Sequence, residues 1–301
     1  MKKRVIGGIC LALAMLFSVA GCQSEKKEKE EDKTPDAAQM ESLIPKGEES
    51  DKLLEFRKNG IRVGTCNDIP YEYVDDNGSL AGFEIEIIRE ACKRLGITKL
   101  VPVVTSWDVY STELQQNKFD IFSSGVYVTE ERLKVMNFCN KTYNLKECVV
   151  VRKDSGIKSM EDLKDKTVAS IAGMLYMDIT KEAVEKGIFG KAAEGGQPSA
   201  LALDVQTKKV DAAVMDVVMG AYVSSLDNMS DLEVLKDYEA MSADQCSYLL
   251  NIETTDFVKE FNIALDSMKE DGTMKEILDD YGLGDNVIGV EEGKVELPAR
   301  K

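Results

Sequence analysis

The segment from Phe119 to Arg132 holds the residues whose types and spacing point most clearly to chemistry. Phe119–Ser123 is predicted as a strand, Gly125 lets the backbone approach another group closely, and Thr129 is a typical helix N-cap. Arg132 would then lie in the first helical turn, beside backbone N–H groups that have no partner within the helix. A guanidinium in that position can bind a carboxylate through two charge-assisted hydrogen bonds.

Arg132 also has a plainer interpretation. Glu130 and Glu131 stand next to it in the sequence and could form a surface ion pair, which contributes little to stability. From this segment alone, the surface ion pair is the favoured interpretation.

Histidine is absent from the 301 residues. This excludes Ser-His and Cys-His nucleophilic pairs and zinc sites that contain His. An enzyme would have to use carboxylates, Lys or Tyr as its acid or base. We expect no metal and no cofactor.

The N-terminus predicts the compartment. Lys2, Lys3 and Arg4 precede an uncharged run over residues 5–20, and small residues then lead to Cys22, which together are typical of a secretory signal. The ending Val-Ala-Gly-Cys resembles a bacterial lipobox. In that case residues 1–21 are removed, and acyl chains on Cys22 hold the protein on the extracytoplasmic face of the cell membrane. An ordinary signal followed by an incidental Cys is the alternative.

The region after Cys22 is predicted to be a disordered tether over residues 22–50, because it is highly charged and poor in large apolar side chains. The whole chain has a net charge of −16, and the acidic balance argues against a nucleic-acid partner. Five cysteines remain beyond Cys22, with irregular spacing and no Cys-x-x-Cys. We expect mostly reduced, buried thiols, with one or two bridges left open. They are Cys66, Cys92, Cys139, Cys148 and Cys246.

From about Leu53 onward, predicted strands alternate with predicted helices. Residues 61–65 form the first expected strand and residues 83–95 an amphipathic helix, which Gly96 ends. The pattern starts again near Glu147, and a last amphipathic helix is expected over residues 256–270. Repeated β-α-β units predict an α/β fold with parallel sheets flanked by helices, and ligands of such folds bind at the carboxyl ends of the strands.

Several motifs, in order, resemble those of the family 3 bacterial solute-binding proteins, the polar amino-acid receptors of ABC importers. The Asp120–Arg132 segment, from Ser124 onward, resembles the family's Ser-Gly-x-Thr-x-Thr-x-Glu-Arg signature. Other matches run from about Gly60 to Gly284. They are Gly60-Ile-Arg-Val-Gly-Thr65, Pro70-Tyr-Glu-Tyr73, Gly78-x-Leu-x-Gly-Phe-Glu84, Trp107 with Leu114–Asp120, Val135–Phe138, Val210–Asp216 and Asp271–Thr273.

The resemblance implies roles for single residues. Arg132 would bind the α-carboxylate of an amino acid, together with backbone N–H groups near Gly125 and Tyr127. Asp216 would accept the α-ammonium, although it could instead only cap the helix that follows. Tyr71 would form an aromatic wall, against the alternative of ordinary core packing, which for Trp107 is the favoured interpretation.

This chain departs from the family pattern at three places. Tyr127 stands where the family usually has Thr or Ser, and Met174 and Leu175 replace hydroxyl-bearing residues after Gly173. The first loop is one residue shorter, so that Asp68 would have to substitute for the family's acidic residue. A larger, more apolar or aromatic amino acid would fit these changes.

The family's fold implies a two-lobed, type II periplasmic-binding-protein-like architecture, in which each lobe is a mostly parallel sheet flanked by helices. We expect lobe 1 over 51–145 plus 246–301 and lobe 2 over 147–243, with closure around the ligand and a membrane permease as the partner of a monomer. Two alternatives remain open: an enzyme on the same fold, resembling cyclohexadienyl dehydratase, and an extracellular sensor lipoprotein that presents its bound solute to a receptor.

Overall fold

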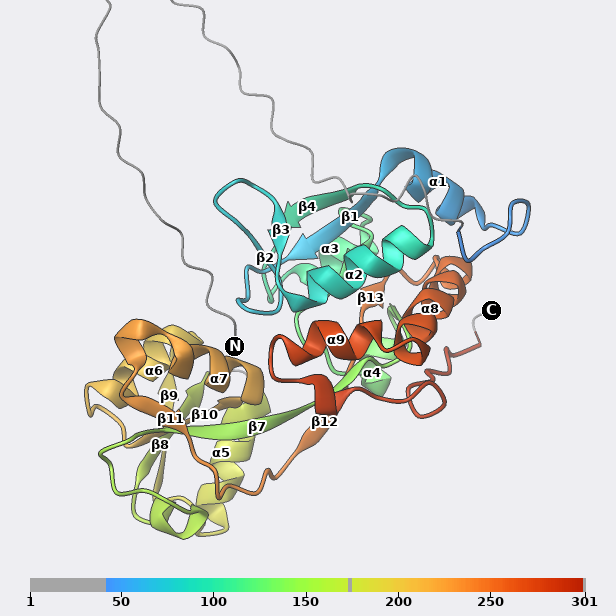
Figure 1. Cartoon of the computed structure of the whole chain (residues 1–301). Helices are drawn as coiled ribbons and strands as arrows, with labels where there is room; N and C mark the ends of the chain where they lie inside the picture. The colour runs from blue at the N-terminus through green and yellow to red at the C-terminus, as the bar shows by residue number, and fades with distance from the viewer. Residues whose placement is uncertain (1–41, 173–174, 300–301) are drawn as a thin grey trace, which may run out of the picture. The chain divides into compact units, whose positions relative to one another are not determined.

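A computed structural model describes residues 42–172 and 175–299 of the chain, so that the predicted signal, Cys22 and residues 22–41 of the tether lie outside the described residues. Two principal sheets, each with its own helices, make up the body (Figure 1). Among the described residues, no helix is both long enough and apolar enough to cross a membrane.

The first sheet has five strands in the order β4-β1-β5-β13-β6. Strand β1 pairs in parallel with β4 and β5, whereas β13 is antiparallel to both β5 and β6. All strands of the second sheet lie between β6 and β13 in the sequence. Strand β13 therefore brings the chain back to the first sheet. The strands are β1 Ile61–Thr65, β4 Leu100–Val104, β5 Ile121–Phe122, β6 Asn137–Phe138 and β13 Leu249–Leu250, beside a small hairpin of β2 Tyr73–Val74 and β3 Leu80–Ala81.

The helices that accompany the first sheet come from two parts of the sequence, α1 to α4 before the second sheet and α8 and α9 after it. Helix α2 shows why the sequence folds as it does: its apolar face is buried, Glu84 and Glu86 lie in its first turn, and Lys93 and Arg94 lie in its last. Arg94 donates to Asp271 at 2.6 Å and so joins α2 to the end of α8. The helices are α1 Asp51–Asn59, α2 Phe83–Arg94, α3 Tyr110–Gln115, α4 Glu130–Leu133, α8 Thr255–Glu270 and α9 Thr273–Asp279.

The second sheet has the order β11-β7-β10-β8-β9, and β12 pairs with the start of β7. Strand β8 is parallel to β9 and β10, whereas the long β7 runs antiparallel to β10, β11 and β12. The elements are β7 Tyr143–Arg152, β8 Thr167–Ile171, α5 Leu175–Glu185, β9 Lys191–Gly195, α6 Pro198–Gln206, β10 Ala212–Asp216, α7 Val217–Ser225, β11 Leu232–Val234 and β12 Ala243–Cys246.

Two details differ from the sequence-based expectations. Both sheets are mostly parallel, as the family resemblance implied, but each also contains antiparallel strands, because β7 and the chain that returns after β11 run against the repeated β-α-β units. Strand β5 is shorter than the predicted Phe119–Ser123, because the chain turns sharply at Ser124 and Gly125. The five cysteines Cys66, Cys92, Cys139, Cys148 and Cys246 are all free thiols, in line with the expectation of mostly reduced thiols, and all except Cys66 are buried.

Residues 42–50 do not behave as a tether. Leu43 N–H donates to the Arg94 carbonyl at 2.9 Å, Ile44 is buried, and Glu49 pairs with Arg57 at 2.6 Å. The expectation of a disordered tether is therefore wrong for this part, because a few apolar and charged side chains find partners on α1 and α2.

Candidate functional site

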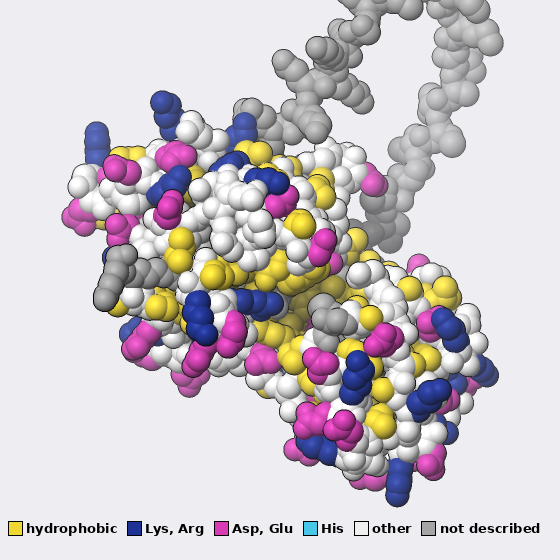
Figure 2. Space-filling model, turned by 180° about the vertical axis from the view of Figure 1, so that it is seen from behind, with side chains coloured by type: hydrophobic (Ala, Val, Ile, Leu, Met, Phe, Trp, Pro, Cys, Tyr) yellow, Lys and Arg dark blue, Asp and Glu magenta, His cyan; other side chains and the backbone are white. Residues whose placement is uncertain are grey.

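A cavity of about 560 Å³ lies where several strands end, and its lining comes from both sheets. Strands β1 and β5 lead into the segments that carry Asp68 and Gly125, whereas β8 leads to Ala172 and β10 ends at Asp216. Figure 2 shows hydrophobic side chains gathered in a hollow on one face of the molecule, with charged side chains over much of the remaining surface. The parallel strands thus deliver their carboxyl ends to one place, as ligand sites in α/β folds require.

Six of the residues proposed from the sequence line this cavity: Asp68, Tyr71, Gly125, Tyr127, Arg132 and Asp216. Gly173 and Met174 lie outside the described residues, although Ala172 and Leu175 on either side of them also line the cavity. The positions that the motifs single out are therefore brought together, including Arg132, on α4 between two strands of the first sheet, and Asp216, at the end of β10 in the second sheet.

Arg132 is the only Lys or Arg among the described residues that line the cavity. Thr129 caps α4 and accepts a hydrogen bond from the Arg132 N–H at 3.3 Å, and Arg132 Nη1 donates to the Tyr127 carbonyl at 2.9 Å. The side chain is half-buried, and no carboxylate of residues 42–172 or 175–299 forms an ion pair with it, so the predicted surface pair with Glu130 or Glu131 is not made. The remaining guanidinium donors are available to a ligand.

The turn before Arg132 supplies backbone donors in an unexpected way. Gly125 N–H donates to the buried carboxylate of Glu84 at 3.1 Å, so this group is not free to receive a ligand carboxylate. In contrast, Val128 N–H donates to Gln245 and the Val126 carbonyl accepts from Ser247, a bridge pattern that leaves the Tyr127 N–H without an acceptor among the described residues. The Tyr127 N–H is therefore the better candidate for a second hydrogen-bond donor, beside Arg132, to a ligand carboxylate.

Asp216 caps a helix, as one interpretation of the sequence held, and it also lines the cavity. Its Oδ1 accepts from the Met219 N–H at 2.7 Å and so caps α7, and it also accepts from the Tyr71 hydroxyl at 2.7 Å. Burial raises the pKa of Asp216 to about 6, against the lowering effect of these hydrogen bonds. The residue is thus a helix cap and a carboxylate that lines the cavity, and a cation beside it would favour its charged form.

Tyr71 packs in the core and also lines the cavity. Its side chain is only 3% exposed and its ring lies 5.1 Å from that of Phe83, as core packing requires. Its hydroxyl reaches Asp216, so the ring also forms a wall of the cavity. A Phe at this position could pack in the same way but could not donate to Asp216.

Asp68 and Trp107 form a polar contact on the same wall. Trp107 Nε1 donates to Asp68 Oδ2 at 2.6 Å, and the Ser124 hydroxyl donates to the same oxygen at 2.7 Å. The indole ring packs edge-on against Tyr110 and Phe122. Trp107 is therefore a packing residue, as favoured from the sequence, that also fixes the orientation of a carboxylate in the cavity.

Tyr176 is a lining residue that the sequence analysis missed. It lies on α5, and its hydroxyl forms a hydrogen bond with that of Tyr127. Burial raises the pKa of both phenols, so both stay protonated. Its place two residues after Met174 was the available signal, since the loop before α5 was already expected to contribute to the site.

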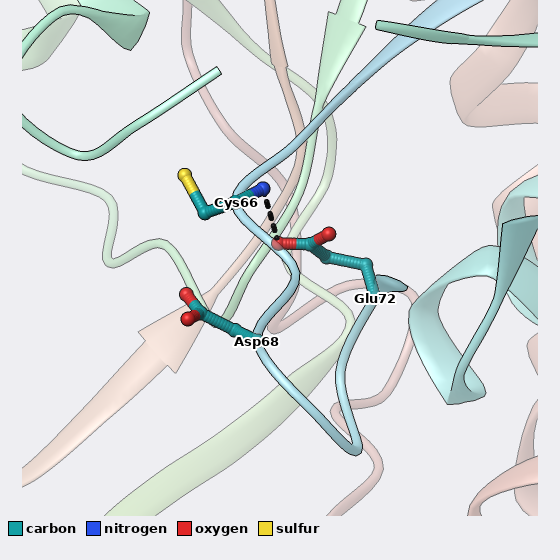
Figure 3. A group of neighbouring side chains, drawn as sticks. All are labelled: Cys66, Asp68 and Glu72. Atoms are coloured by element: carbon teal, nitrogen blue, oxygen red, sulfur yellow. Dashed lines mark hydrogen bonds between the residues drawn. The ribbon is translucent and has the colours of Figure 1, made fainter. Parts of the chain in front are cut away.

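Cys66, Asp68 and Glu72 form the one group in the described chain whose ligand atoms lie close enough to hold a metal, within 4.8 Å of one another. Figure 3 shows the Glu72 carboxylate turned to the Cys66 backbone N–H, from which it accepts at 3.0 Å. Its other oxygen accepts from the Thr65 hydroxyl. Burial raises the pKa of Glu72 to about 8 and that of the Cys66 thiol as well, so the donors that a cation needs are engaged or protonated.

Residues 61–284 match the model of the bacterial extracellular solute-binding proteins, family 3, which covers about three quarters of the chain. The chain belongs to this family.

The similarity extends to individual family 3 proteins. The arginine-binding extracellular protein ArtP of Bacillus subtilis is 29% identical over 226 residues, 74% of this chain and 86% of that protein. The L-cystine-binding protein TcyA of the same organism is 30% identical over 234 residues, 76% of this chain and 84% of that protein.

Solved structures confirm the predicted fold class for this family 3 protein. The ancestral amino-acid-binding protein AncCDT-1, described as a precursor of cyclohexadienyl dehydratase, superimposes with a TM-score of 0.62 at 28% identity and covers 76% of this chain and 99% of its own. The resemblance drawn from the motifs is thus confirmed at the level of family and fold.

The helix cap that Asp216 provides and the buried charge that it carries have separate effects on stability, which substitutions can distinguish. Between about pH 4 and 6 the folded protein keeps a proton on Asp216 that the unfolded chain has released, because the pKa rises from 3.8 to about 6. The contribution of this group to the free energy of unfolding therefore falls as the pH rises through that window and stays low above it.

We expect Asp216→Asn, which keeps a capping oxygen and removes the charge, to be at least as stable as the wild type at pH 7 in urea unfolding. Asp216→Ala, which also removes the cap, should be about 1 kcal/mol less stable than Asp216→Asn. Equal losses for the two variants at pH 7 would contradict this assignment.

Proposed function

We propose that this chain is the extracytoplasmic solute-binding component of an ABC importer and that it binds an α-amino acid in the cavity. The observation that carries the proposal is the placement of Arg132, on α4 next to the first sheet, and Asp216, at the end of β10 in the second sheet, in the lining of a single cavity. A guanidinium and a carboxylate set apart in this way complement the carboxylate and ammonium of a zwitterion.

Ligand contacts on both sheets would couple binding to closure. The proposed lobes are 51–145 plus 246–301 and 147–243, with β7 and β12 as the hinge, since these two strands pair where the chain passes between the sheets. An amino acid held by Arg132 and by Asp216 would stabilise only the arrangement in which both reach it. The permease would recognise that arrangement, and a lipid on Cys22 would keep the protein at the membrane.

The remaining lining sets limits on the side chain of the ligand. Tyr71, Trp107, Tyr127 and Tyr176 provide aromatic surface, which suits aromatic, apolar or cationic groups. Asp68 and Asp108 add two further carboxylates, and Arg132 is already assigned to the ligand's own carboxylate. A second negative charge on the ligand would find no other cationic side chain among the described residues that line the cavity.

An enzyme on the same fold is the second candidate. Asp216 has a raised pKa in the cavity and could serve as an acid, as a chain without histidine would need. The similarity to the precursor of a dehydratase supports the same possibility. Steady formation of product from a bound amino acid would favour the enzyme, whereas recovery of the ligand unchanged would favour the binding protein.

The ligand class can be tested by isothermal titration with the L-amino acids. We expect the tightest binder to have a bulky neutral or a cationic side chain, and Asp and Glu to bind at least about 100-fold more weakly, because like charges brought together cost several kcal/mol. Preferential binding of Asp or Glu would contradict the charge argument, and no binding by any member would contradict the amino-acid assignment.

Arg132→Ala tests the carboxylate contact. The loss should reduce affinity by about 2–5 kcal/mol in the same titration, because the ligand carboxylate would stay buried without its partner. Arg132→Lys keeps the charge but not the planar fork, so we expect an intermediate loss. Unchanged affinity in Arg132→Ala, with normal folding by circular dichroism, would refute the role of Arg132.

A further inference from the structure

We infer that Glu84, which lies behind the cavity and does not line it, is the positioning residue that holds the ligand-binding turn at Ser124 and Gly125. The inference rests on the proposed function, since the turn leads directly to Tyr127 and Arg132. It assigns a role in binding to a residue that would make no contact with the ligand.

The Glu84 carboxylate joins three parts of the fold. It lies in the first turn of α2 and is fully buried. One oxygen accepts from the Ser124 N–H and, at 3.1 Å, from the Gly125 N–H, and the other accepts from the Tyr143 hydroxyl at 2.7 Å. Tyr143 is the first residue of β7, so the same side chain connects α2, the turn and the proposed hinge strand.

The turn needs such an anchor because its backbone is disfavoured. Ser124 has a φ of 112° and Gly125 a φ of 62°, and a side-chain-bearing residue rarely adopts the first of these. In this conformation the N–H groups of Ser124 and Gly125 both point to the Glu84 carboxylate, which accepts from them. The Ser124 hydroxyl adds a second attachment, to Asp68.

The backbone of Glu84 fixes a further wall of the cavity. Its N–H donates to the Tyr71 carbonyl at 3.1 Å. A Cβ atom added to Gly125 would lie 3.0 Å from Tyr71 Cε1, so the turn and the Tyr71 ring are in close contact. Displacement of the turn would therefore move the Tyr71 wall and the Tyr127 N–H together.

Among the residues that the structure describes, the titratable groups that face Glu84 include no cation. They are Asp68 and Glu72 from the loop after β1, Tyr143 from β7, Cys246 from β12 and Tyr248 from the segment after it. The carboxylate thus depends on its hydrogen-bond donors, and burial raises the pKa of Glu84 to about 7. Protonation of Glu84 would place an O–H donor next to the N–H and hydroxyl groups that donate to the carboxylate, and the turn would lose part of its acceptor. Ligand affinity should therefore fall as the pH drops through neutrality.

The test compares Glu84→Gln with Glu260→Gln. Glu260 is a matched control because it is also buried and accepts from the N–H and the hydroxyl of one residue, Ser50, but lies on α8 and does not line the cavity. Amide hydrogen exchange over residues 123–127 measures the turn directly. Affinities for L-arginine and L-phenylalanine, a cationic and an aromatic probe, measured from pH 5.5 to 8.5, report its effect on binding.

We expect Glu84→Gln to speed exchange of the turn about 10-fold or more and to weaken binding about 10-fold to 100-fold at pH 8, since the amide keeps one acceptor oxygen but replaces the other with an NH2 donor that faces the buried donors of the turn and Tyr143. Its affinity should also lose the part of the pH dependence that Glu84 contributes near neutrality. Glu260→Gln should match the wild type in both measurements. In Tyr143→Phe the carboxylate loses one donor, so the midpoint of the pH profile should move upward while the turn stays protected.

Wild-type exchange rates in the turn of Glu84→Gln would overturn the inference whether or not an amino acid binds. Tight binding by Glu84→Gln with an unchanged pH profile would also overturn it, and would leave the proposed function intact. Faster exchange of the turn in a protein whose wild type binds neither probe nor any other amino acid would instead contradict the proposed function and, with it, the role of Glu84 in binding.

Discussion

A guanidinium held in a cavity with few internal partners is the feature on which the site depends. Arg132 makes one side-chain hydrogen bond, to the Tyr127 carbonyl, and the cap at Thr129 fixes the backbone from which it projects. A positive charge that is half-buried and not paired with a carboxylate of the described chain can gain much from an anionic ligand. The turn at Ser124 and Gly125, the short helix α4 and the ends of β1 and β5 all serve to place this one charge.

The opposite charge comes from the second sheet and is more firmly held. Asp216 accepts from the backbone of α7 and from Tyr71, so its position is set before any cation reaches it. Because the carboxylate is buried, an ammonium group beside it would interact with it more strongly than with a solvent-exposed carboxylate. Closure around a zwitterion would thus bring together two groups that each sheet has oriented separately.

Local patterns predicted the parts of this arrangement that local physics controls. The amphipathic α2, the strand β1 and the cap at Thr129 depend on neighbours within a few residues, and the sequence analysis found all three. Motif order also predicted which loops meet at the cavity. Gly125 was different, because its N–H donates to a residue 41 positions earlier, and no periodicity relates the two.

Other features that the sequence analysis did not predict have the same physical origin. The contact of Tyr127 with Tyr176 joins elements of different sheets, and the packing of residues 42–50 depends on Arg57 and on the end of α2. The antiparallel direction of β7 is set by its course from one sheet to the other and not by its composition. Long-range contacts decided each of these features, and only coordinates or an exact fold template could have supplied them.

The most direct measurement of the central claim is a crystal structure of the protein with its tightest-binding amino acid. The account predicts the ligand's carboxylate oxygens within about 3 Å of the Arg132 guanidinium and its ammonium nitrogen at a similar distance from Asp216. An amino acid bound elsewhere, or bound in this cavity with its carboxylate turned away from Arg132, would contradict it.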